Sequence, residues 1–143
     1  MLVIAVISIG SAYAVKAGAA LSRHDAEQEL LAVGIEFQNA LRSFAATSPP
    51  GAPRAPRTLD DLLRDPRHPA TIRHLRRLPH DPLTGKRDWM VVRSPQGIVA
   101  IHSAAAGTPL KSASFDRDLG HLEGERKSYR DWLFIGPEAQ RPQ

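Results

Sequence analysis

The sequence predicts an α+β protein in which one long N-terminal helix packs on a small antiparallel β-sheet head. Three observations carry this prediction. No proline interrupts the chain between Met1 and Ser48, and a proline-rich connector follows over residues 47–57. After Gly85 the apolar residues change from helical spacing to short runs rich in β-branched residues. A chain of 143 residues is enough for one domain, and we assign residues 47–143 to the head.

The predicted helix, residues 1–46, changes character half-way along its length. Residues 2–21 carry a single charge, at Lys16, and have the length and composition of a membrane-embedded segment. Residues 22–46 are amphipathic, because apolar side chains at steps of three and four form one stripe on a helix. The stripe predicted to seat the head comprises Leu30, Val33, Phe37, Leu41 and Phe44. The polar residues predicted on the other faces are Glu27, Gln28, Glu36, Gln38, Asn39 and Arg42.

Residues 1–21 have two other interpretations. A secretory signal peptide would explain Ala12-Tyr13-Ala14, which matches an A-x-A cleavage site, although no basic residue precedes the apolar run. Cleavage there would release a secreted or periplasmic binding module. A core helix is the second alternative, but it would place an uninterrupted apolar surface in a very small body. We favour membrane anchorage, because residues 2–21 are long enough and Lys16 can extend toward an interface.

The head is predicted to contain short elements separated by prolines and glycines. Thr58 should cap a short helix over residues 59–65, with Asp61 as its capping-box partner. Thr71 should start a further helical turn, which ends at Pro79. The predicted strands are a hairpin of residues 88–94 and 97–103, joined by Ser-Pro-Gln-Gly, and a third strand over residues 128–136.

The stretch Leu-Pro-His-Asp-Pro-Leu-Thr-Gly-Lys-Arg-Asp-Trp, residues 78–89, is dense in polar groups, and we interpret it as structural. Asp81, Pro82 and Gly85 are typical of a chain reversal in which the aspartate caps the turn. Trp89 then begins the hairpin and is the predicted anchor of the head against the helix. His80 is expected to contribute little.

No pattern in the sequence predicts an enzyme or a metal site. The chain has no cysteine, and its six histidines form neither an H-x-x-x-H nor an H-E-x-x-H pair. The His24-Asp25 and His80-Asp81 pairs lack further ligands at helical spacing. Ser103 follows His102, but no G-x-S-x-G elbow accompanies them. We therefore expect no catalytic residues and no cofactor.

The net charge of +4 makes nucleic acid and anionic lipid candidate partners. The densest basic cluster is Arg73-His74-Leu75-Arg76-Arg77. On a helix the three arginines would share a side that suits phosphate. Because no aromatic residues are interleaved, nucleic acid is not the expected partner, and anionic membrane lipid suits the cluster at least as well. A basic pilin-like module that contacts nucleic acid is kept as an alternative function.

Taken together, the half-apolar helix, the connector, the Asp81-Pro82-Leu83-Thr84-Gly85 turn and the short sheet resemble the type IV pilin-like proteins. Among these the chain is most similar to the major-pseudopilin-like subunits of bacterial type II secretion. "EQELL" at 27–31 and "DLLRDPR" at 61–67 also resemble this subgroup. The resemblance covers essentially the whole chain.

The resemblance implies a pilin-like fold and a structural subunit without enzymatic activity. Such a subunit would be anchored by one span in the bacterial inner membrane, with its head in the periplasm. Its partners would be further copies of itself and other pseudopilins in a helical fibre, the inner-membrane secretion platform, and membrane lipid. The residues expected to carry assembly are Leu2, Val3, Ile4, Val6, Ile7, Ile9, Val15 and Leu21.

The chain departs from the family pattern in two places. The resemblance implies a leader glycine and a glutamate at the fifth mature position, whereas this sequence opens with Met-Leu-Val-Ile-Ala; we expect a start placed too far downstream. The resemblance also implies calcium in a loop after the hairpin. The matching stretch, residues 102–118, carries Lys111 and has no acid before Asp116 and Asp118, whereas calcium needs several oxygen ligands.

Overall fold

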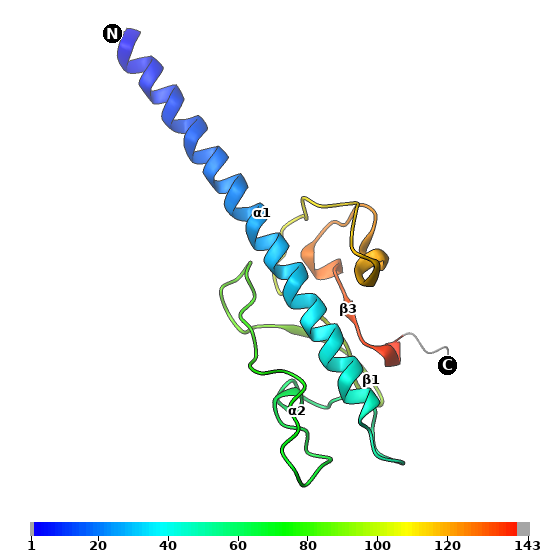
Figure 1. Ribbon diagram of the computed structural model, residues 1–143. Helices are drawn as coiled ribbons and strands as arrows, with labels where there is room; N and C mark the ends of the chain where they lie inside the picture. The colour runs from blue at the N-terminus through cyan, green and yellow to red at the C-terminus, as the bar shows by residue number, and fades with distance from the viewer. Residues whose placement is uncertain (1, 140–143) are drawn as a thin grey trace.

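Helix α1 is the axis on which the head is built. The computed structural model describes residues 2–139, and side chains from residue 22 onward. Helix α1 extends from Leu2 to Ala46, as the uninterrupted proline-free segment predicts. At 1.5 Å per residue it is about 68 Å long. The head lies along its C-terminal half (Figure 1).

The predicted location in the bacterial inner membrane is wrong. No helix in the described part of the chain combines the length and the apolar character needed to cross a membrane. This finding contradicts the predicted single span. The predicted assembly residues fall where the structure does not describe side chains: Leu2, Val3, Ile4, Val6, Ile7, Ile9, Val15 and Leu21.

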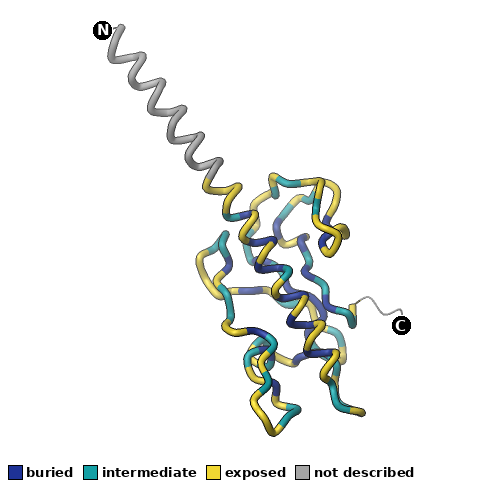
Figure 2. The backbone as a smooth tube through the Cα atoms, in the orientation of Figure 1, coloured by how far each residue is buried: buried dark blue, intermediate teal, exposed yellow. Residues whose placement is uncertain are grey.

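The head contains a three-stranded antiparallel sheet in the order β1-β2-β3. Strands β1 (Met90–Ser94) and β2 (Gly97–His102) form the predicted hairpin, with a register shift between Val92 and Arg93. Strand β3 (Phe134–Ile135) pairs with the other side of β2. The central strand is therefore the most buried of the three, and together with β3 it packs against α1 (Figure 2).

A glycine on α1 allows the sheet to approach the helix closely. A Cβ atom placed on Gly34 would lie 2.0 Å from the ring of Phe134, which is a fully buried core residue. Gly136 follows β3 and approaches Leu41 closely, so that a Cβ atom placed there would lie 3.0 Å from the Leu41 side chain. Both positions favour the absence of a side chain, because a larger residue would push the backbone of the helix away from the sheet.

Two predicted elements of the head differ from the structure. The third strand is only two residues long, because a 3₁₀ turn, η2 (Tyr129–Asp131), occupies the start of the predicted range. Residues 72–78 form no helix. Their backbone instead makes tertiary hydrogen bonds: the N–H groups of His74 and Leu75 both donate to the carbonyl of Leu62, at 2.8 and 2.9 Å. A segment this short between two prolines gains too little from helix formation to compete with these bonds.

The short helix after the connector is α2 (Asp60–Leu63). It lacks the predicted Thr58 side-chain cap, and only half of the capping box is present. The Asp61 carboxylate accepts the backbone N–H groups of Arg57 and Thr58, at 2.8 and 3.0 Å. Two further 3₁₀ turns, η1 (Arg117–Leu122) and η3 (Pro137–Ala139), complete the head.

Candidate functional site

The packing stripe on α1 lies in the core as the periodicity predicts. Leu30 and Phe37 are fully buried, and no member of the stripe is more than 8% exposed. The ring of Trp89 packs edge-on against Phe37, with ring centroids 4.9 Å apart. The Trp89 indole also donates to the carbonyl of Pro79 at 2.9 Å, so the tryptophan ties the hairpin to both the helix and the preceding turn. The stripe members are Leu30, Val33, Phe37, Leu41 and Phe44.

Glu27 is buried in the head, although the sequence placed it on a polar face of the helix. Its carboxylate accepts the backbone N–H groups of Leu110 and Lys111, at 3.1 and 2.7 Å. The hydroxyl of Tyr129 donates to the same carboxylate at 3.3 Å. A carboxylate with three donors is well satisfied in a buried position, and it holds the loop of residues 104–111 against the helix.

Arg23 lies one helical turn before Glu27 on α1 and binds the same loop. Its guanidinium donates to the carbonyl of Thr108 at 2.6 Å and to the hydroxyl of Tyr129 at 3.4 Å. Burial raises the pKa of the Tyr129 phenol; the Arg23 guanidinium opposes this rise, and the negative charge of Glu27 adds to it. Arg23, Glu27 and Tyr129 therefore form one polar cluster at the point where α1 enters the head; we call it the loop clamp.

The residues around the loop clamp test whether this loop can hold the calcium ion that the family resemblance implies. The loop carboxylates Asp116 and Asp118 are both exposed. Glu27, the buried carboxylate at this loop, already accepts N–H and O–H donors, which a cation would have to displace. Across the described residues, no three His, Asp or Glu side chains gather closely enough to hold a metal ion. The donor set does not fit calcium, because a hard cation needs several oxygen ligands turned toward it.

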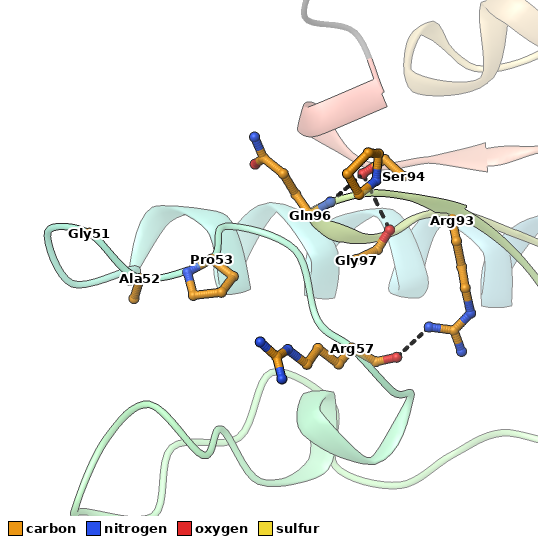
Figure 3. A pocket seen from close by; sticks show the side chains of 9 residues that line it. Gly51, Ala52, Pro53, Arg57, Arg93, Ser94, Gln96 and Gly97 are labelled. Atoms are coloured by element: carbon orange, nitrogen blue, oxygen red, sulfur yellow. Dashed lines mark hydrogen bonds between the residues drawn. The ribbon is translucent and has the colours of Figure 1, made fainter.

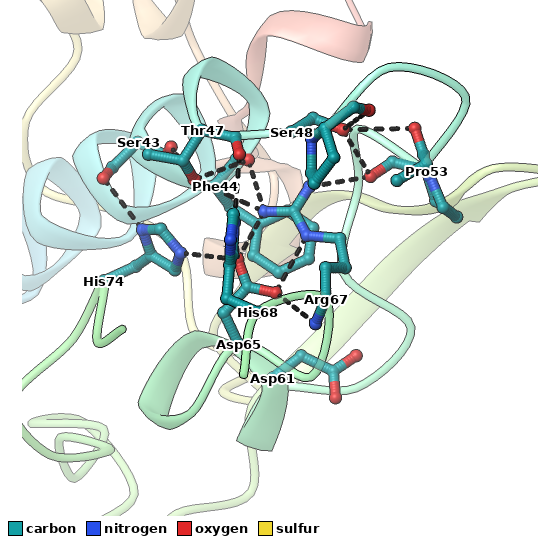
Figure 4. A network of polar contacts seen from close by, with 12 residues as sticks. Ser43, Phe44, Thr47, Ser48, Pro53, Asp61, Asp65, Arg67, His68 and His74 are labelled. Carbon is teal, nitrogen blue, oxygen red and sulfur yellow. Dashed lines mark hydrogen bonds and ion pairs between the residues drawn. The ribbon is translucent and has the colours of Figure 1, made fainter. Parts of the chain in front are cut away.

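A second polar cluster closes the other end of the packed helix (Figure 4). The Arg67 guanidinium donates to the carbonyl of Phe44, in the last turn of α1, at 2.7 Å, and to Pro53 of the connector at 2.8 Å. It also stacks 3.5 Å from the centre of the Phe44 ring. A cation at a helix C-terminus pairs with unsatisfied carbonyl groups and with the negative end of the helix dipole. Arg67 thus caps α1 from the head.

Asp65 holds the Arg67 side chain in position. The two side chains form a buried ion pair at 2.5 Å, and Asp65 is 1% exposed. The hydrogen bond from the Arg67 side chain holds the pKa of the Asp65 carboxyl well below its usual range, and a weaker hydrogen bond from His74 acts in the same direction. Asp65 is thus a permanently charged partner for Arg67 at neutral pH.

Ser43, His74 and Asp65 lie in a line that resembles a hydrolase triad. The Ser43 hydroxyl is 2.8 Å from Nδ1 of His74, and Nε2 of His74 is 3.2 Å from an oxygen of Asp65. Two features argue against catalysis. Ser43 lies within a helix, where backbone N–H groups are used in the helix and cannot form an oxyanion hole. The carboxylate of Asp65 is already paired with the Arg67 guanidinium, so it is less available to orient and polarise His74. The line therefore serves to fasten residues 65–75 to α1.

The turn at residues 81–85 has the structural role that its sequence predicts. One carboxylate oxygen of Asp81 accepts the N–H of Leu83 at 2.9 Å, and its carbonyl accepts the N–H of Gly85 at 2.7 Å. Gly85 has a φ of +70°, which favours glycine. The other carboxylate oxygen accepts the hydroxyl of Ser103 at 2.6 Å in the core. Pro82, at the centre of the reversal, is partly buried.

The candidate catalytic residues of the sequence are not brought together. Ser103 is buried and bonded to Asp81, whereas Nδ1 of the adjacent His102 lies 2.9 Å from a backbone oxygen. His24 and His80 are exposed. A hollow of about 700 Å³ lies between the connector and the hairpin turn (Figure 3), where Arg93 donates to the carbonyl of Arg57 at 2.5 Å. Its lining contains neither a carboxylate nor a histidine, so it has no general base.

Comparison with known proteins adds no family. No family model matches the chain, and it has no match among curated proteins or solved structures. The fold class rests on the structure itself: an α+β protein in which α1 packs on a three-stranded antiparallel sheet, an arrangement compatible with a pilin-like fold.

Proposed function

We propose that the chain is a structural, pilin-like subunit that assembles with copies of itself and with related subunits into a fibre of a bacterial type II secretion machine. In this role the chain performs no catalysis. The head would decorate the fibre, and α1 would supply the contacts between subunits that support protein export.

The observation that carries this proposal is how the head is attached to α1. In the described part of the chain, contacts with the head extend from Arg23, bonded to Thr108, to the final turn, where the Phe44 carbonyl meets Arg67. Polar clusters hold both ends of this stretch and the apolar stripe fills the middle. A head fastened along about half of a helix is a rigid unit with that helix, as a fibre subunit requires.

The sequence of the other half supports the same role. Residues 2–21 contain one charged side chain, Lys16, among mostly apolar ones. A helix with apolar side chains on every face needs surroundings that cover them all. In a fibre, the corresponding helices of neighbouring subunits would provide that cover, and each contact would join different surfaces of two copies. Such heterologous contacts propagate into filaments when the rotation between neighbouring subunits does not close a ring.

Disulfide cross-linking tests the proposal cleanly, because the chain has no cysteine of its own. Two cysteines would be introduced per chain, one within residues 2–11 and one within residues 12–21, for example Ile7→Cys with Val15→Cys. Oxidation should give a ladder of dimers, trimers and higher species for pairs that face each other in the fibre.

The matched control is a variant with two cysteines on separate exposed loops of the head, Thr71→Cys with Ser112→Cys, which should remain mostly monomeric. If a scan of pairs through residues 2–21 yields no species beyond the monomer, or closed dimers alone, the fibre proposal is wrong.

A further inference from the structure

One segment of the chain has a marked excess of positive over negative charge. Residues 73–87, here called the basic segment, contain five cationic side chains and one carboxylate, Asp81, which is buried in its turn. The segment therefore has a formal charge of +4, equal to the net charge of the whole chain. The five cations are Arg73, Arg76, Arg77, Lys86 and Arg87, and all are exposed.

These cations have no partners within the described part of the protein. None of the five side chains forms a hydrogen bond or an ion pair there. Other arginines of the head do: Arg67 pairs with Asp65, and Arg54 with Glu138. A cluster of like charges without partners repels itself, and binding an anionic ligand would relieve that repulsion.

The basic segment is nevertheless held in a fixed shape. Leu75, near its start, is buried, and the Leu75 N–H donates to the carbonyl of Leu62 in α2. The carbonyl of Pro79 accepts the indole N–H of Trp89, and Asp81 organises the turn that follows. Because the backbone is anchored at these points, a ligand would meet arginines that are already in position and would lose little affinity to ordering the loop.

A groove beside α1 indicates the shape of this ligand. The groove has a volume of about 870 Å³, and Arg76, Arg77 and Arg87 line one side of it. Glu29 and Glu36 of α1 line the other side. These carboxylates would repel a small anion held within the groove, whereas the three arginines are exposed to solvent and can reach an anion outside it. The arrangement favours an extended polyanion that lies along the segment.

We propose that the basic segment binds the phosphate backbone of double-stranded DNA without reading its sequence. Regularly spaced phosphates on a stiff duplex suit several arginines on a fixed backbone. A stacked single strand is less suitable, because the aromatic residues beside the segment, Phe44 and Trp89, are both buried. This binding surface is independent of the fibre contacts proposed for residues 2–21.

The test is fluorescence anisotropy of a labelled duplex of about 20 base pairs of mixed sequence, titrated with the full chain at several salt concentrations. The wild type should bind in a salt-dependent manner. The variant Arg76→Gln/Arg77→Gln/Arg87→Gln should bind at least about 10-fold more weakly at low salt, and its log–log salt slope should be smaller by roughly 2 to 3.

The control variant removes the same number of positive charges from outside the basic segment. Arg57, Arg64 and Arg117 are exposed and have no side-chain partner among the described residues. Their triple replacement by Gln should weaken binding by no more than about 3-fold, and circular dichroism should show that both variants are folded. Equal losses in the two triple variants, or a wild type that binds anionic vesicles but not the duplex, would overturn the proposal.

Discussion

The carboxylate of Glu27 lies 2.7 Å from the backbone nitrogen of Lys111 and joins α1 to a loop far away in the sequence. This hydrogen bond is the centre of the loop clamp, since the same carboxylate also accepts Leu110 and Tyr129. The head therefore depends on a buried charge as well as on its apolar core.

Replacing Glu27 with Ala should destabilise the protein by about 2 to 4 kcal/mol, because two buried N–H groups and a hydroxyl lose their acceptor. The neighbouring exposed acid Glu29 gives the matched control, and Glu29→Ala should change stability by less than about 0.5 kcal/mol. Urea unfolding followed by tryptophan fluorescence measures both. Similar values for the two variants would show that the clamp contributes nothing to stability.

Calcium should have no effect on the stability of the chain. Adding millimolar CaCl₂ or EDTA should move the midpoint of thermal unfolding by less than about 1 °C, because Arg23, Glu27 and Tyr129 hold the loop by direct hydrogen bonds. A ligand present at 100 times its dissociation constant would add about 2.7 kcal/mol to the free energy of unfolding. A stabilisation of that size, reversed by EDTA, would contradict our interpretation of the loop.

Replacing Trp89 with Ala should destabilise the protein far more than replacing His80 with Ala. Trp89→Ala removes an indole that packs on Phe37 and bonds to Pro79, and it should cost about 3 to 5 kcal/mol. His80 is exposed, and His80→Ala should cost less than about 0.5 kcal/mol. Chemical denaturation of both variants is the measurement. A larger cost at His80 would mean that the 78–89 stretch has a role other than packing.

Gly34→Ala should destabilise the protein although alanine is the better helix former. The gain in helix propensity is about 1 kcal/mol, but the new methyl group would overlap the Phe134 ring. Overpacking of this kind costs about 1 to 3 kcal/mol. Gly120→Ala is the control, because a Cβ there meets no atom within 4 Å. Thermal unfolding should show a lower midpoint for the first variant alone.

Asp65 should make stability depend on pH in the acid range. Its pKa is lower in the folded chain than in the unfolded chain, so its contribution is complete above the ordinary carboxyl pKa. The contribution is lost progressively as the pH falls below that value. Asp65→Asn should be less stable than the wild type at pH 7 and should lose less stability between about pH 5 and pH 2.5. If the free energy of unfolding fell in parallel with pH for the two proteins, the Asp65–Arg67 pair would not be the source of the pH dependence.

Periodicity predicted the elements that depend on local pattern. The stripe from Leu30 to Phe44 repeats at three and four, and its members are buried. The hairpin follows from β-branched runs around Pro95 and Gly97, and the turn follows from Asp81 and Gly85. Each of these depends on neighbours in the sequence, so one sequence is enough to predict it.

The polar clusters could not be predicted in this way, because their partners are distant along the chain. Glu27 meets residues more than 80 positions away, and nothing local predicts Tyr129 as its donor. One signal was present: Glu27 precedes Leu30 by three residues and so continues the apolar stripe toward the N-terminus. A charged side chain at such a position is a candidate for burial with partners. The hydrogen bonds from His74 and Leu75 to Leu62 likewise have no local signature, so the sequence predicts a helix over residues 72–78 where the structure has none.

The central claim is that subunits associate through residues 2–21 of α1 and display their heads outward. Electron cryomicroscopy of the assembled protein, with helical reconstruction, tests it most directly. The account predicts filaments whose axial density is made of helices corresponding to residues 2–21, surrounded by heads fastened along residues 23–46. Filaments with heads on the axis, or a protein that forms no filament under any assembly condition, would contradict it.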